Sequence, residues 1–192
     1  MSLHSEFDEI VRQFSSGDAV ASVDKLCQVL AIARDASVAA GQLPSLRREC
    51  QSHPIWRMLL EDPYTRRAYE KPRGYAGDAV MMDFVYSGEA PSETSAVGRM
   101  VFAATTRLPN GKSVVWRRDH VATRIDDIAS KVDRPVISSV ACGHLRECQK
   151  SVAVRDGRIG MVYAFDQDSA SLDVVRLQPF PDFVRATIHN VY

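Results

Sequence analysis

The sequence predicts an α/β protein in which an N-terminal helical domain precedes a partial parallel sheet of about three strands. Two patterns predict this class. Apolar residues recur at helical spacing through the first part of the chain, whereas short apolar runs alternate with helical segments near its end. Strands that alternate with helices are typical of a parallel sheet. We therefore divide the chain into a helical domain over residues 1–111 and a sheet domain over residues 112–192.

The composition is that of an ordinary globular protein and argues against several classes. The 192 residues are 45% hydrophobic, and Lys plus Arg equal Asp plus Glu at 24 each, so the formal net charge is zero. A nucleic-acid-binding protein more often carries a basic excess, and no apolar run approaches the length of a membrane span. The sequence therefore predicts neither a nucleic-acid partner nor a membrane span.

The cysteines and the N-terminus indicate a reducing compartment. The four cysteines show no CxxC spacing, and the N-terminus lacks the basic and then apolar order of an export signal. We therefore expect reduced thiols and a cytoplasmic protein. The five histidines lie far apart without paired ligand spacing, so the sequence predicts no metal site.

The first domain contains a series of short amphipathic helices. Asp18 is a favourable N-cap for the longest of them, which is expected to run to about Ala40. Pro54 and Pro63 each suit the first turn of a short helix. Further helices are expected at 5–14, 45–51, 80–86 and 93–107.

The segment Lys71–Asp78 interrupts this helical pattern and is predicted to be a loop with functional side chains. Its glycines permit unusual backbone angles or close approach of a ligand. Arg73 offers a planar fork for a carboxylate, and Tyr75 and Asp78 offer a hydroxyl group and an acceptor. We assign Arg73, Tyr75 and Asp78 to a substrate or cofactor pocket. The alternative is a self-contained structural loop held by an Arg73–Asp78 pair.

The second domain alternates helices and strands. A long helix is expected at 113–131, followed by strands at 136–140, 160–166 and 183–192 with helices at 144–155 and 168–177 between them. The small residues Ala141, Cys142 and Gly143 form the turn after the first strand. Asp166 ends the second strand about twenty residues later, where a nucleotide-binding fold places the acceptor for ribose hydroxyls. A helix-capping role for Asp166 is the alternative.

Together, the first turn and Asp166 resemble the first half of a Rossmann-like class I S-adenosylmethionine-dependent methyltransferase. The resemblance implies cofactor contacts at Ala141, Cys142, Gly143 and His144 in the turn and at Asp166 and Gln167 after the second strand. The family pattern has an acid near the position of Ser139 and more than one glycine, and this chain departs from it at both points.

A narrower resemblance rests on Lys71-Pro72-Arg73-Gly74-Tyr75-Ala76-Gly77-Asp78 together with Ala141-Cys142-Gly143-His144. Both segments resemble the bacterial group that makes 3-hydroxy fatty acid methyl ester signals. This resemblance implies S-adenosylmethionine as the cofactor and the carboxylate of a 3-hydroxy fatty acid as the methyl acceptor, with Arg73 positioning it. For Arg117 and Arg118, the interpretations are a salt bridge, a contact with the cofactor carboxylate, or a solvated helix face.

The family sheet is larger than the three strands expected here, which leaves the enzymatic activity open. A truncated, non-catalytic methyltransferase-like module used for dimerisation or regulation is the alternative function. The exposed edge of the first strand and the low net charge favour self-association, so we expect a homodimer or a fragment of a longer protein. A dehydrogenase is disfavoured because the sequence lacks Gly-x-Gly-x-x-Gly.

Overall fold

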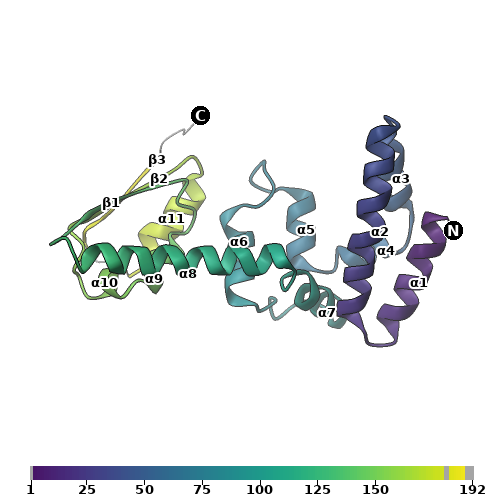
Figure 1. Ribbon diagram of the computed structural model, residues 1–192, viewed down its shortest axis with the longest axis horizontal. Coiled ribbons are helices and arrows are strands. Elements are labelled where there is room, and N and C mark those ends of the chain that lie inside the picture. The colour runs from purple at the N-terminus through teal and green to yellow at the C-terminus, as the bar shows by residue number, and fades with distance from the viewer. Residues whose placement is uncertain (1, 180–181, 189–192) are drawn as a thin grey trace. The chain divides into compact units, whose positions relative to one another are not determined.

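The computed structural model describes residues 2–179 and 182–188, which form two compact units. The first unit comprises Met1–Pro72 and Ser87–Gly111, and the second comprises Arg73–Tyr86 and Lys112–Tyr192. A helical region is followed by a small parallel sheet, as the sequence predicts (Figure 1). Gly111 ends the first unit, and the loop that carries Arg73 belongs with the sheet.

The first unit is built from short helices. Their bounds are α1 Leu3–Ser15, α2 Ala19–Ala39, α3 Leu43–Ser52, α4 Ile55–Leu59, α5 Pro63–Glu70 and α7 Ala96–Thr105. The predicted cap of α2 is present, since the Asp18 carboxylate accepts the N–H of Ala21 at 3.1 Å. Phe7, Ile10, Leu26 and Ile55 of α1, α2 and α4 form a buried cluster. No described helix of the chain is both long and apolar enough to cross a membrane.

A second cap, Asp62, is completely buried and connects two helices of the first unit. Its carboxylate accepts the backbone N–H groups of Tyr64 and Thr65 at 2.9 and 3.2 Å. It also accepts the hydroxyl groups of Thr65 at 2.6 Å and of Thr105 at 3.0 Å. Asp62 therefore caps α5 and ties it to α7.

We expect Asp62→Ala to lower the free energy of unfolding of the first unit by about 1–2 kcal/mol, because it removes a helix cap and the hydrogen bonds that the half-buried hydroxyl groups of Thr65 and Thr105 donate to the carboxylate. Chemical denaturation followed by circular dichroism measures this change. Asp18→Ala is the matched control, because Asp18 is exposed and its carboxylate accepts one backbone N–H. Equal losses in the two variants would contradict the role assigned to Asp62.

The second unit contains the sheet. Its elements are α6 Ala79–Ser87, α8 Pro109–Ala129, β1 Val136–Val140, α9 Arg146–Lys150, α10 Val152–Arg155, β2 Met161–Asp166, α11 Ser169–Leu177 and β3 Val184–Ile188. The unit boundary crosses α6 and α8 near one end of each helix. The strands lie in the order β1-β2-β3 and are all parallel, with Val136 opposite Met161 and Val162 opposite Val184. The predicted partial parallel sheet is confirmed.

One face of this sheet carries the core, and the other is exposed. Val162 and Ala164 of β2 pack with Leu172 of α11 and Ile125 of α8 in a buried cluster, and the helices lie on that side of the sheet (Figure 1). On the opposite face, Val136 and Val140 are 64% and 61% exposed, and Tyr163 is 40% exposed. Parallel sheets usually have both faces buried. In the part of the chain that the structure describes, this sheet instead leaves one face exposed.

Three details differ from the sequence-based expectation. The helix expected at 144–155 is two short helices, because Ser151 adopts an extended backbone conformation and its hydroxyl caps α10 at the N–H of Val154. The long helix expected at 113–131 is α8, which begins earlier, with Pro109 in the first helical position. β3 ends at Ile188, and the part of the predicted strand over 189–192 lies outside the described residues.

Candidate functional site

The turn after β1 has an unusual backbone. Ala141, Gly143 and Leu145 all have positive φ angles of 53°, 54° and 53°. A Cβ atom added to Gly143 would lie 3.2 Å from the Cβ of Ala79 in α6. Glycine at this position therefore allows both the left-handed backbone and the close approach of α6.

Asp166 holds this turn to the end of β2. Its side chain is buried, Oδ2 accepts the N–H of Gly143 at 2.8 Å, and Oδ1 accepts the N–H of Asp168 at 2.9 Å. A carboxylate oxygen has a second lone pair, so these bonds leave acceptor capacity for a ligand hydroxyl. Helix α11, which follows, is capped by Asp168 and not by Asp166: the Asp168 carboxylate accepts the N–H of Ala170 at 3.0 Å.

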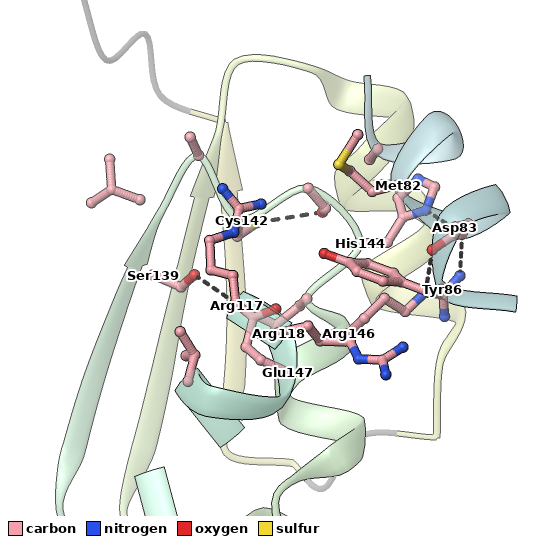
Figure 2. A pocket seen from close by; sticks show the side chains of 16 residues that line it. Met82, Asp83, Tyr86, Arg117, Arg118, Ser139, Cys142, His144, Arg146 and Glu147 are labelled. Carbon is pink, nitrogen blue, oxygen red and sulfur yellow. Dashed lines mark hydrogen bonds and ion pairs between the residues drawn. The ribbon is translucent and has the colours of Figure 1, made fainter. Parts of the chain in front are cut away.

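A first hollow of about 360 Å³ lies beside the turn, between α6, α8 and α9. We call it the turn hollow. Polar and charged side chains line much of it (Figure 2): Asp83, Tyr86, Arg117, Arg118, Ser139, His144, Arg146 and Glu147. The predicted residues Ala141, Cys142, Gly143 and His144 all line it as well.

Asp83, His144 and Arg146 form a hydrogen-bonded cluster in the wall of this hollow (Figure 2). Nδ1 of His144 lies 2.7 Å from Oδ2 of Asp83. The Arg146 guanidinium donates to both oxygens of the same carboxylate, at 2.7 Å from Nε and 2.6 Å from Nη2. This bidentate geometry fixes the carboxylate and, through it, the imidazole ring.

The charges of the cluster determine the protonation state of Asp83. Burial alone would raise the pKa of this carboxyl group, but hydrogen bonds from Arg146 and then His144 outweigh burial and lower the pKa to about 2. Asp83 is therefore an anion near neutral pH, and Nδ1 of His144 must carry the hydrogen that it shares with Asp83.

Glu147 places a second acid in the turn hollow. Its side chain is held near β1, where the Ser139 hydroxyl donates to Oε1 at 3.5 Å. Burial raises the pKa of Glu147, while its own backbone N–H and the charge of Arg117 oppose this effect. The glutamate thus supplies a carboxyl group beside the strand position where the sequence has serine.

Arg118 contributes positive charge to the opposite wall and is buried. Its guanidinium lies 4.7 Å from the centre of the Tyr86 ring, within range of a cation–π contact, and pairs with Asp119 at 2.7 Å. Arg117 also lines the hollow and interacts with the Tyr86 hydroxyl. The hollow therefore combines carboxylates and guanidinium groups.

Cys142 is not suited to nucleophilic chemistry. Burial, with smaller contributions from Asp166 and Glu147, raises the pKa of its thiol to about 12. The thiol stays protonated near neutral pH, so Cys142 acts as a small turn residue.

A second and more open hollow of about 650 Å³ lies near the ends of β2 and β3, and we call it the strand-end hollow. It is lined by Arg73, Gly74, Tyr75, Gln167, Asp168, Ser169 and Ile188. Nη1 of Arg73 donates to Asp168 at 2.7 Å and to the Ser171 hydroxyl at 2.9 Å. The Arg73 loop is therefore anchored to the start of α11.

The predicted site residues occupy four environments. Arg73, Tyr75 and Gln167 share the strand-end hollow, and His144 lies with the turn residues in the turn hollow. Asp78 is buried at the start of α6, where it accepts the N–H of Met81 at 3.1 Å. Asp166 is not a lining residue of either hollow, and it joins the two turns by accepting the backbone N–H groups of Gly143 and Asp168.

Sequence reasoning missed Asp83, Tyr86, Arg146 and Glu147 as site residues. Asp83 is the only charged residue in the apolar run Val80–Tyr86, and an isolated acid in an apolar helix is a signal for a buried partner. Nothing in the local sequence identifies that partner, because 61 residues separate Asp83 from His144. Within the described residues, no group of three or more His, Cys, Asp and Glu side chains could hold a metal ion.

Comparisons with known proteins identify no family. No protein-family profile matches the chain, and no curated protein matches it. A solved structure described as a possible exported protein from Bordetella parapertussis matches with 18% sequence identity and a TM-score of 0.47. The match covers 77% of this chain and 53% of that chain, so this chain aligns with about half of the solved protein.

Proposed function

We propose that the second unit binds S-adenosylmethionine and serves methyl transfer to a small-molecule substrate. The observation that carries the proposal is the position of the Asp166 carboxylate. This carboxylate joins the turn after β1 to the turn after β2. A hollow lies beside each of these two turns. In open parallel sheets, ligands bind in the crevice outside the carboxyl ends of the strands. Both hollows lie at that edge of the sheet.

The turn hollow suits the amino-acid end of the cofactor. An α-amino-carboxylate carries both charges, and this hollow offers the Glu147 carboxyl group together with Arg117 and Arg118. Glu147 lies beside Ser139, where the family pattern has its acid, and so takes over the role of the missing side chain. Nε2 of His144, which is buried and has no hydrogen-bond partner among the described residues, is a further acceptor in the wall of this hollow.

The strand-end hollow suits the nucleoside end of the cofactor. Asp166 has acceptor capacity for ribose hydroxyl groups, and Gln167 follows it directly. Tyr75 offers an aromatic ring, and burial raises the pKa of its hydroxyl, with further contributions from Asp168, Asp166 and Asp78. The tyrosine is therefore a neutral hydrogen-bond donor at physiological pH.

Once bound, S-adenosylmethionine supplies an electrophilic methyl group on a positively charged sulfur. The protein must align the acceptor with that group and exclude water. The sequence resemblance points to a 3-hydroxy fatty acid with its carboxylate as the acceptor. Arg73 uses Nη1 for Asp168 and Ser171, and its other N–H groups suit a substrate carboxylate. We place the enzyme in the cytoplasm, as the sequence indicates.

A non-catalytic methyltransferase-like module is the second candidate. The exposed face of the three-stranded sheet favours it, because a catalytic domain of this class uses a sheet covered on both sides. In that case, the unit supports dimerisation or regulation and has little affinity for the cofactor. The titration below separates the two functions.

Calorimetric titration with S-adenosylhomocysteine tests the proposed function. We expect the wild-type chain to bind, and Asp166→Asn to weaken binding by roughly 10- to 100-fold, because one charge-assisted acceptor is lost. Asp173→Asn is the matched control, since Asp173 lies on α11 and pairs with Arg176 at the exposed surface. Unchanged affinity in a folded Asp166→Asn variant would remove the ribose role, and no binding by the wild type would favour the non-catalytic module.

A further inference from the structure

The first unit contains a hollow that the proposed methyl transfer does not use, and we call it the helix hollow. Its volume is about 720 Å³, and its lining residues come from α1, α2, α3 and α4 (Figure 1). Pockets that hold small molecules usually have volumes of about 300–1,000 Å³ and are mostly apolar. The helix hollow is therefore large enough for a small-molecule ligand.

Two of its walls are helix faces with the same pattern. On α2, Leu26, Leu30 and Arg34 are each four residues apart, so they lie on one face of the helix. On α3, Leu43 and Arg47 have the same spacing. Each face therefore contributes apolar side chains and one arginine to the helix hollow.

The most buried lining residues belong to the core of the unit. Phe7, Leu26 and Ile55 are at most 6% exposed and form part of its buried cluster. Leu30 and Leu59 pack against that cluster and are partly buried. The inner end of the helix hollow is therefore apolar, which suits a hydrocarbon chain.

The charges in the lining are of one sign. Among the described residues that line the helix hollow, Arg34 and Arg47 are the charged ones. Burial raises the pKa of the Cys27 and Cys50 thiols in the same lining, so both thiols are neutral near pH 7. Both arginines are exposed, and an arginine keeps its guanidinium in water while its stem covers apolar surface. The positive charges therefore lie at the mouth of the hollow.

Both guanidinium groups are available to a ligand. In the part of the chain that the structure describes, the Arg47 guanidinium has no hydrogen bond or ion pair. Arg34 pairs with Asp35 at 2.9 Å, but the two side chains are 64% and 72% exposed. Such an exposed pair contributes little to stability and can exchange its partner. The planar fork of arginine matches the geometry of a carboxylate.

We propose that the helix hollow binds an aliphatic carboxylate, with the alkyl chain between α2 and α3 and the carboxylate at Arg47 and Arg34. A ligand that is polar throughout would lose its hydrogen bonds to water against the apolar lining. A cationic head group would be repelled by the arginines. A carboxylate carries one negative charge and matches the one unpaired guanidinium better than a phosphate monoester, whose charge is about −1.5 to −2. This site shares no lining residue with the turn hollow or the strand-end hollow and does not depend on methyl transfer.

Trp56 lines the helix hollow and reports on its occupation. The chain has two tryptophans, so Trp116→Phe leaves Trp56 as the source of tryptophan fluorescence. Titration of this variant with sodium decanoate should change the fluorescence saturably. 1-Decanol has the same chain without the charge and should bind at least about 10-fold more weakly, and acetate should not bind.

Three results of this titration would overturn the assignment. These are no saturable change with decanoate, equal affinity for 1-decanol, and tighter binding of decyl phosphate than of decanoate. A signal that follows protein concentration and does not respond to decanoate would assign the hollow to a second copy of the chain instead. The S-adenosylhomocysteine titration reports on other residues, so its outcome leaves this test unaffected.

The arginines are tested by combining Arg34→Gln with Arg47→Gln. The double variant should bind decanoate roughly 10- to 100-fold more weakly, whereas its affinity for 1-decanol should not change. Arg12→Gln is the matched control, because Arg12 is exposed on α1, pairs with Glu9 and does not line the hollow. Unchanged decanoate affinity in the double variant would overturn the role of the arginines.

A blocking variant tests the position of the alkyl chain. Ala31 is exposed on α2 and lines the helix hollow, so Ala31→Phe should fill part of it and weaken the binding of both decanoate and 1-decanol by at least about 10-fold. Ala36→Phe is the matched control, since Ala36 is exposed on the same helix outside the lining. Circular dichroism verifies that both variants fold. Equal affinities in the two folded variants would overturn the proposed site.

Discussion

Asp83→Ala is expected to lower the free energy of unfolding of the second unit by about 1.5–3 kcal/mol, because Arg146 and His144 each lose a hydrogen bond to a charged partner. The arginine is left partly buried without its carboxylate, which adds to the loss. Urea denaturation at neutral pH, followed by fluorescence, measures the change.

The pH dependence of this difference follows from the pKa of Asp83. The folded state lowers this pKa to about 2, below the ordinary value of 3.8, so the stabilisation is present above about pH 4. It is lost as the pH falls from about 4 to about 2, because the carboxyl group is then protonated in both states. The curves for wild type and Asp83→Ala should therefore converge in acid.

Asp127→Ala is the matched control for Asp83→Ala. Asp127 lies on α8 in the same unit and pairs with Arg124 at 3.4 Å, and both side chains are exposed. An exposed ion pair contributes about 0–1 kcal/mol, so this variant should unfold almost as the wild type does. If Asp83→Ala were no more destabilising than Asp127→Ala, the cluster would have no structural role.

Self-association through the sheet is the second large effect that we expect. β1 is one of the two edge strands of the described sheet, and Val136, Val140 and Tyr163 form an exposed apolar surface on one face. An unpaired edge beside such a surface invites pairing with another chain. We therefore expect the chain to dimerise as its concentration rises. Light scattering measures the corresponding increase in average molecular mass.

Val136→Lys should weaken this association by roughly 10- to 100-fold, because it removes the burial of one valine and introduces a charge. Val132→Lys is the control, since Val132 is 50% exposed but precedes the strand, whereas Val136 is 64% exposed within it. A monomer at every concentration, with slow amide exchange across Val136–Val140, would show instead that the edge is covered within one chain.

Local sequence signals were sufficient to predict most of the secondary structure. Residues 136–140 were predicted as the first strand on the basis of β-branched residues after Pro135, and the structure has the same bounds. Asp18 and the prolines before the short helices act locally, through caps and first turns, so their effects are visible in sequence. The break at Ser151 was missed because a serine within an apparently continuous helix gives only a weak signal.

The candidate site was less predictable because its decisive contacts are long-range. The pairing of Arg73 with Asp168 joins residues 95 positions apart, and no rule of spacing identifies it. Asp83 was read as part of an amphipathic helix, although its partners His144 and Arg146 lie beyond β1. A solvated helix face was one alternative for Arg118, but the side chain is buried against Tyr86, a contact that depends on where α6 places this tyrosine.

The most direct test of cofactor binding is amide NMR of the chain titrated with S-adenosylhomocysteine. We expect saturable shifts at Ala141–His144 and at Asp166–Gln167, together with Tyr75, while the signals of the helical unit around Phe7 and Ile10 are unchanged. Shifts that are absent from both turns, or that fall only on the helical unit, would contradict this expectation.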